Sequence, residues 1–110
     1  MTLDPRWDPA ALEDLQDGHR WYEEREPGLG RELAVEIDKA INQAMHHPFL
    51  LKKHEHPNLP TTPEVRKFQL DRFDEYGLVY AVVGEAFWIV AVAHAKRKPG
   101  YWMDRLKKLT

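Results

Sequence analysis

Imidazole groups are the first side chains in this sequence that suggest chemistry, because six histidines occur in 110 residues. His46-His47 and the triplet His54-Glu55-His56 are the densest groups. Adjacent side chains on a helix point in different directions, so His46 and His47 are poorly placed to share one ion. The helical pair of histidines four residues apart that zinc proteases use is absent from the sequence. We therefore interpret these histidines as surface and loop residues and expect no metal and no other cofactor.

His94 differs from the other histidines because it ends the most apolar segment of the chain and precedes the basic run at 96–98. Its imidazole could serve general acid–base chemistry, since it titrates near neutrality. A backbone hydrogen bond at the end of a strand is the alternative. Arg66 lies in another apolar segment, where its guanidinium could bind phosphate or form a salt bridge with a helix acid.

Basic residues gather near the C-terminus, where residues 96–108 hold six bases against one acid. The first fifty residues carry a net charge of −6 and the rest +4, so the total of −2 argues against general nucleic-acid binding but allows one basic face. We expect this segment to be the functional surface, with Arg97, Lys98 and Arg105 as candidates for binding the target. Tyr101 and Trp102 could stack on bases, or anchor the segment on the core with Arg97 and Arg105 facing outward.

Length and composition place the chain among single globular domains, here residues 1–110. The sequence has no cysteine, which excludes a disulfide scaffold, a thiolate zinc site and a thiol nucleophile. It also has no apolar run long enough to span a bilayer and no signal peptide, so a cytoplasmic protein without membrane association is expected.

Two amphipathic helices are predicted in the first half of the chain. Asp8-Pro9 is typical of a helix start, and an apolar stripe at 12, 15, 19 and 22 continues to about residue 26. Gly28-Leu29-Gly30 is read as a turn rather than a phosphate loop, because it lies between two helices. The second helix should stop at His47-Pro48, since proline disfavours helical geometry in the residue before it. So short a junction predicts an antiparallel helix hairpin.

The second half of the chain changes to the alternation of β-strands. Residues 48–63 are predicted to be a loop, and residues 65–70, 78–83 and 87–93 to be strands of an antiparallel meander. A weaker edge strand is expected at 2–7, and a short C-terminal helix at 101–109. The predicted fold is therefore α+β, with the helix hairpin packed on a three- to four-stranded antiparallel sheet.

Two strings in this sequence resemble the RelE/ParE toxin superfamily. Residues 21–30 (WYEEREPGLG) look like the superfamily's junction between its first two helices. Residues 92–102 (VAHAKRKPGYW) are similar to the end of its last strand, with Arg105 in the place of a following arginine. Between them, residues 65–68 and Phe73 stand where the superfamily has an arginine-bearing strand and an aromatic residue. The resemblance covers nearly the whole chain and is closer to the ParE-like, plasmid-stabilisation branch.

The resemblance implies the toxin of a type II toxin–antitoxin module, silenced by a cognate antitoxin in a hetero-oligomeric complex. RelE-like members cut mRNA in the ribosomal A site, whereas ParE-like members inhibit DNA gyrase. For this chain it implies a ParE-like toxin that inhibits gyrase, with a ribosome-dependent mRNA interferase as the alternative and a non-toxic interaction domain as the third reading. The antitoxin is expected on an exposed sheet edge and in a groove between the helix hairpin and the sheet.

The sequence departs from the nuclease members in its charge. Its isoelectric point is about 6.3, its first helix is acidic around Asp14, and residues 71–76 carry acids where the superfamily often has arginines. Arg66, His94 and Tyr101 could still supply a phosphate clamp, an acid and an orienting phenol for metal-independent RNA cleavage. The residues alone therefore leave open whether the chain is an enzyme.

Overall fold

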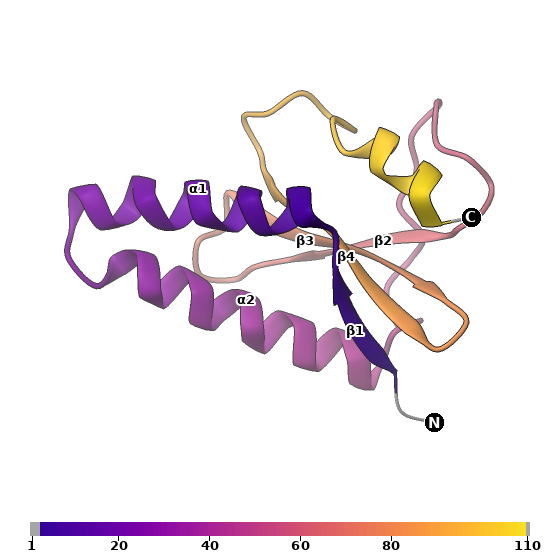
Figure 1. The fold of residues 1–110 in the computed structure, drawn as a ribbon, viewed down its shortest axis with the longest axis horizontal. Coiled ribbons are helices and arrows are strands. Elements are labelled where there is room, and N and C mark those ends of the chain that lie inside the picture. The colour runs from indigo at the N-terminus through magenta and orange to yellow at the C-terminus, as the bar shows by residue number, and fades with distance from the viewer. Residues whose placement is uncertain (1–2, 110) are drawn as a thin grey trace.

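The computed structural model describes residues 3–109 and confirms an α+β fold (Figure 1). A helix hairpin and a C-terminal 3₁₀ helix surround a four-stranded sheet. In chain order the elements are β1 (Asp4–Trp7), α1 (Pro9–Arg25), α2 (Leu29–His46), β2 (Val65–Gln69), β3 (Tyr76–Val83), β4 (Ala86–His94) and the 3₁₀ helix (Met103–Leu109). None of the helices within residues 3–109 is long and apolar enough to cross a membrane.

Both ends of the helix hairpin follow from local sequence. The Asp8 side chain caps α1 by accepting a hydrogen bond of 2.8 Å from the Ala10 N–H, and Pro9 occupies the first turn. Helix α2 ends at His46, directly before His47-Pro48. The predicted hairpin is therefore confirmed.

The buried face of α1 differs from the predicted stripe. Its buried residues are Ala11, Asp14 and Gly18, whereas Leu12 is 43% exposed. Leu15 and Tyr22 do pack against the core, but from its margin. Small side chains take the centre of this face because α1 lies close to both α2 and β4.

The strands are ordered β1-β4-β3-β2, and one pairing differs from the prediction. Strands β2, β3 and β4 form the expected antiparallel meander, but β1 pairs with β4 in parallel, which makes the sheet mixed. No short turn joins β1 to β4, since the helix hairpin and two strands separate them in the chain, so a parallel pairing is sterically open. Thr2, which the predicted edge strand included, lies outside the described residues.

Strand β4 contains a β-bulge where it pairs with β3. Tyr80 pairs with Ile89 and Val79 with Ala91, so Val90 is an additional residue in β4. The additional residue is left without a partner in β3, so the ladder is interrupted and the strand bends at this point. The tight turn before β4 has Gly84 with a φ of 61°, the positive value expected for a glycine in this turn.

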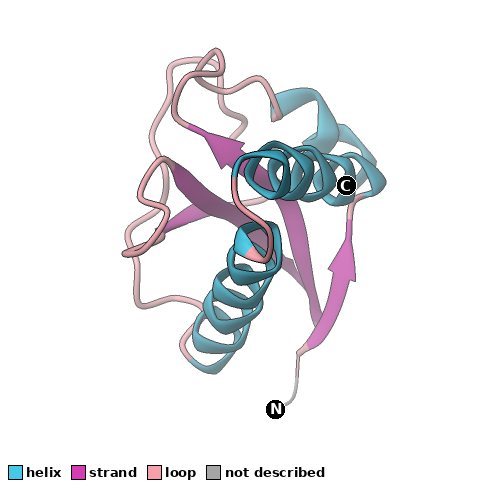
Figure 2. Ribbon diagram, turned by 90° about the vertical axis from the view of Figure 1, so that its left-hand side faces the viewer, coloured by secondary structure: helices cyan, strands magenta, loops and turns pink. Residues whose placement is uncertain are grey.

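The helix hairpin packs over the sheet (Figure 2), and clusters of hydrophobic side chains cover the sheet on both faces. One cluster lies under the helix hairpin and includes Leu33, Tyr80 and Phe87. The other lies under the C-terminal segment, where Trp102 and Leu106 pack against Val79 and Ala91. The C-terminal segment is therefore part of the core as well as a basic surface.

Candidate functional site

A buried carboxylate organises the C-terminal segment. The side chain of Asp14 is only 5% exposed and accepts hydrogen bonds from three side chains. Arg105 donates to it through Nη1 at 2.7 Å and Nη2 at 3.2 Å, Arg97 through Nη1 at 3.2 Å, and the Tyr101 hydroxyl at 3.1 Å. We call Asp14, Arg97, Tyr101 and Arg105 the Asp14 cluster.

The Asp14 cluster also supplies hydrogen-bond partners for backbone groups on the edge of β4 that β1 does not cover. Strand β1 ends at Trp7, and the last backbone contact on this side is the Asp8 N–H donating to the Ile89 carbonyl at 3.0 Å. At the bulge, the Val90 carbonyl accepts a 2.9 Å hydrogen bond from Arg105, and beyond it the Val92 N–H donates to Asp14 at 3.2 Å. Side chains thus take the place that a longer β1 would occupy and close this edge to further pairing.

Burial and charge fix the protonation of the cluster's donors. Burial raises the pKa of the Tyr101 phenol, and the neighbouring Asp14 carboxylate raises it further. Burial alone would lower the pKa of Arg105, but its hydrogen bond and charge pairing with Asp14 raise it. Tyr101 therefore stays a neutral hydrogen-bond donor and Arg105 a cation at physiological pH.

The three candidate target-binding residues have different surroundings. Arg105 was expected to point outward, and this is wrong: its side chain is 14% exposed because it pairs with buried Asp14. Arg97 is half exposed and lies 3.7 Å from the centre of the Tyr101 ring. Lys98 is exposed and its ammonium forms no ion pair within residues 3–109. Arg97 and Lys98 thus lie at the surface, and their binding of a target stays a prediction.

His94 is held by hydrogen bonds at both ring nitrogens. Nδ1 accepts from the Lys96 N–H at 3.0 Å, which leaves the proton on Nε2, and Nε2 lies 3.0 Å from a Glu75 carboxylate oxygen. The ring also packs edge-on against Tyr76. The expected backbone hydrogen bond is present, and the Nε2 proton is directed at Glu75.

Arg66 is largely buried and bound to the long loop before β2. Its Nε donates to the Leu51 carbonyl at 2.9 Å and its Nη2 to Glu64 at 3.2 Å, and its guanidinium faces the Phe49 ring. The salt bridge expected for Arg66 is present, but its acidic partner is Glu64, two residues earlier in the chain, and not an acid on a helix.

The proposed nuclease residues do not form one constellation. Arg66 pairs with Tyr80 and His94 with Tyr76, so they lie four residues apart along β3 with a strand between them. At roughly 3.3 Å per residue this is about 13 Å along the strands alone. The Tyr101 hydroxyl meanwhile donates to Asp14. Arg66 as the phosphate clamp, His94 as the acid and Tyr101 as the phenol therefore cannot act on one phosphate in this arrangement.

The string at residues 21–30 contains a carboxylate, that of Glu23, which caps the second helix. Glu23 accepts hydrogen bonds from the Gly28 N–H at 2.9 Å and the Gly30 N–H at 3.0 Å. The hydrogen bond from Gly28, and to a smaller extent that from Gly30, lowers the pKa of Glu23. Gly28 has a φ of 91° and no side chain to cap α2, so Glu23 supplies the cap from α1.

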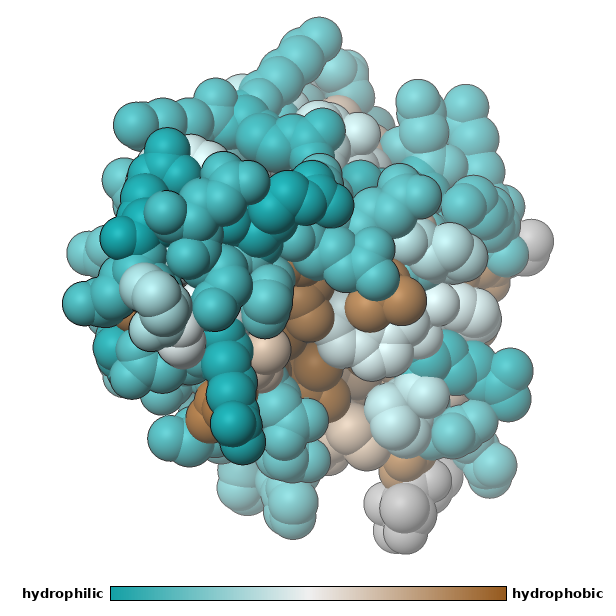
Figure 3. Space-filling model, turned by 60° about the vertical axis from the view of Figure 1, so that its left-hand side comes forward, coloured by the Kyte–Doolittle hydropathy of each residue, from teal (hydrophilic) through white to brown (hydrophobic). Residues whose placement is uncertain are grey.

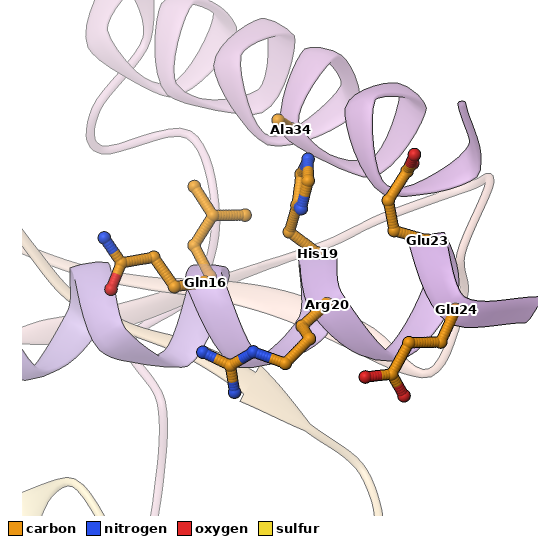
Figure 4. Close-up of a pocket in the computed structure, with 7 residues that line it drawn as sticks. Gln16, His19, Arg20, Glu23, Glu24 and Ala34 are labelled. Atoms are coloured by element: carbon orange, nitrogen blue, oxygen red, sulfur yellow. The ribbon is translucent and has the colours of Figure 1, made fainter. Parts of the chain in front are cut away.

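Two grooves flank α2. An open groove of about 690 Å³ lies between the helices, with Leu15 and Ala34 among its lining residues. Figure 3 shows hydrophobic side chains reaching the surface between hydrophilic ones on this side, and Figure 4 shows His19 and Glu23 rising from α1 toward α2. A narrower apolar pocket of about 240 Å³ lies between α2 and the sheet, lined by Ala44, Leu50 and Phe68 among others. The predicted groove between hairpin and sheet is this second one.

The role of Asp14 was not predicted from the sequence, where this residue counted only toward the acidic charge of the first helix. A usable signal was its place between Ala11 and Gly18, which marks a close-packed helix face. The histidines do not converge: across the described part of the chain no three acidic or imidazole side chains are placed to hold a metal ion.

Comparisons with known proteins identify relatives of this chain. Residues 6–99 match the family model described as the ParE toxin of the type II toxin–antitoxin system parDE. A solved structure of a chromosomal ParDE toxin–antitoxin system from P. aeruginosa has a similar fold, with a TM-score of 0.68 and 17% sequence identity over 84% of this chain and 96% of that chain. No curated protein matches the sequence.

Proposed function

Since this chain belongs to the ParE toxin family of type II toxin–antitoxin systems, we propose that a cognate antitoxin neutralises it and that its cellular target is DNA gyrase. The toxin would act by binding and not by catalysis. The complex with the antitoxin would be hetero-oligomeric.

The separation of Arg66, His94 and Tyr101 is the observation that supports gyrase over the ribosome. Metal-independent RNA cleavage needs a base, an acid and a cation around one phosphate. Here Arg66 is bound to Leu51 and Glu64, and His94 to Glu75. The ribosome-dependent mRNA interferase is therefore the weaker alternative for this chain.

Purified enzymes can separate these activities. We expect the toxin to inhibit DNA supercoiling by gyrase and to leave mRNA intact in a translation assay. Lys98→Ala should weaken gyrase inhibition, whereas Lys39→Ala, an exposed lysine on α2, should not. Ribosome-dependent cuts that disappear in His94→Ala would favour the nuclease. Normal growth at verified folded expression, with neither assay responding, would favour a non-toxic interaction domain.

The antitoxin is proposed to bind the outer edge of β2 and the pocket beside it. The β4 edge is occupied by the Asp14 cluster, and β1 is short and contains Pro5, which cannot donate a hydrogen bond. Near β2 the side chains of Phe49 and Leu50 are 63% and 79% exposed. The loop before β2 bridges this edge between Lys53 and Arg66, with the His54 N–H donating to the Val65 carbonyl at 2.6 Å, so an extended antitoxin segment could add a strand there by displacing this bridge.

Amide exchange in the reconstituted complex tests this docking site. Protection should appear in β2 and in the loop around Phe49, and not at the N–H of Val92, which is already bonded to Asp14. Protection confined to the groove between α1 and α2 would instead place the antitoxin on the hairpin.

A further inference from the structure

We propose that a small cavity between β2, the end of β4 and the loop that follows it binds a single phosphate-type oxyanion. The cavity has a volume of about 120 Å³ and lies on the sheet face covered by the C-terminal segment, with Ala93 and Trp102 among its lining residues. It is separate from both grooves beside α2 and does not depend on the identity of the toxin's target.

The cavity gathers lysine and arginine side chains, of which only Arg97 has an acidic partner within residues 3–109, the Asp14 carboxylate. His54, Lys67, Arg97 and Lys98 line it, and no acidic side chain in the described part of the chain does. Lys67 and Lys98 form no ion pair with any residue between 3 and 109. Such a grouping of cations around a recess attracts a small anion.

Three separate segments hold these side chains in place. The stem of Lys67 lies across Gly77 on the neighbouring strand, where a Cβ would collide with it. Lys98 begins a turn that is closed by the Tyr101 N–H donating to the Lys98 carbonyl at 3.1 Å, with Gly100 at a φ of 75°. Burial lowers the pKa of His54, and the charges of Lys67 and His56 lower it further. An anion in the cavity would offset these positive charges and so raise the pKa of His54.

The lining favours a phosphate group over a base. Arg97 covers the Tyr101 ring, and Trp102 is 3% exposed, so neither the Tyr101 ring nor the Trp102 ring is free to stack on a nucleobase. Lysine ammonium groups bind phosphate as point charges. The Tyr101 hydroxyl donates to Asp14 and the His94 ring packs on Tyr76, so the cavity would hold a phosphate without cleaving it. Inorganic phosphate and the backbone phosphodiester of a nucleic acid offer the same oxyanion.

Nuclear magnetic resonance titration of the purified toxin with inorganic phosphate tests the site. We expect saturable shifts at His54 and Lys98 and a raised pKa of His54 in the bound form. Lys67→Met keeps the stem over Gly77 and removes only the ammonium. It should weaken binding about tenfold, as for the loss of one charge-assisted hydrogen bond. Lys39→Met on α2 is the matched control and should bind as the wild type does.

Parallel titrations identify the source of the phosphate. Tighter binding of a dinucleotide than of inorganic phosphate, still sensitive to Lys67→Met, would identify a nucleic-acid backbone as the ligand. Binding of inorganic phosphate alone would identify a free phosphate site. The proposal would be overturned by shifts that never saturate or by equal affinity for phosphate in Lys67→Met and Lys39→Met. It would also be overturned by cleavage of an RNA dinucleotide, or by binding of an acidic peptide but not of phosphate.

Discussion

Asp14 is the residue on which the C-terminal segment depends most. It joins a strand edge, two arginines and a tyrosine through one carboxylate group. Such a group is costly to bury unless every partner is present, and here each buried side-chain polar atom of the described residues has a partner. The cluster therefore ties the placement of Arg97 to the integrity of α1.

Asp14→Ala should lower the free energy of unfolding by about 3 kcal/mol, because it leaves Arg105 and the Val92 N–H without their acceptor. Denaturant unfolding followed by circular dichroism measures this. Asp17→Ala on the same helix is the control, since Asp17 is 70% exposed in a surface pair with Arg20 and should change stability by less than about 0.5 kcal/mol. Equal losses in the two variants would contradict a structural role for Asp14.

At the scale of elements, the junction of α1 and α2 depends on one capping carboxylate and one close contact. Glu23 caps the start of α2 from the preceding helix. Gly30 lies against the backbone of α1, where an added Cβ would collide with the His19 carbonyl oxygen. Both residues belong to the string at 21–30, so the string specifies the geometry of the hairpin and not a chemical site.

Glu23→Gln should lower the melting temperature at neutral pH, because an amide accepts hydrogen bonds from N–H groups more weakly than a carboxylate. The folded-state pKa of Glu23 is depressed below its usual 4.5, so its contribution is complete above that value and is lost as the pH falls through the lower folded-state pKa. The difference between wild type and variant should therefore disappear in acid. Glu24→Gln serves as control; a gap between wild type and Glu23→Gln that persists in acid would argue against the charged cap.

Gly30→Ala should destabilise the protein by about 1–3 kcal/mol, the usual cost of overpacking. In an open helix the same change stabilises by about 1 kcal/mol, so the sign of the effect is informative. Thermal unfolding measures it, with Arg31→Ala on the exposed side of α2 as the comparison. A higher melting temperature in Gly30→Ala would show that the two helices can separate to admit a methyl group.

At the scale of the whole molecule, the sheet is a central layer with a different cover on each face (Figures 1 and 2). The helix hairpin covers one face and the C-terminal segment the other. The basic segment is therefore bound to the core by Trp102 and Leu106 from inside and by the Asp14 cluster at the edge. Its exposed cations rest on a rigid support.

Trp102→Ala should cost about 3–5 kcal/mol of stability, because it removes a large buried aromatic side chain from the second face of the sheet. Trp21→Ala is the matched control, since Trp21 is 49% exposed on α1. Chemical denaturation of both variants gives the comparison. Similar small losses would mean that the C-terminal segment contributes little to the fold.

The order of elements and the anchoring role of Trp102 could be predicted from the sequence, because they depend on local properties. Caps, prolines and apolar periodicity act within a few residues, and they placed both helices, the three antiparallel strands and the turn at Gly84. The candidate site could not be predicted in the same way. Arg105 pairs with an acid 91 positions away, and nothing in its own neighbourhood indicates that it points inward.

The parallel pairing of β1, the bulge at Val90 and the burial of Asp14 were decided by tertiary structure alone. Each depends on which backbone groups remain unpaired once the sheet has formed, and that is a property of the assembled strands. The sequence determined which residues could carry charge into the C-terminal segment. The fold decided that Arg105 binds the edge of β4, while Arg97 and Lys98 stay exposed at the surface. The reason is that only the assembled edge offers the carbonyl and carboxylate groups that bind the Arg105 guanidinium.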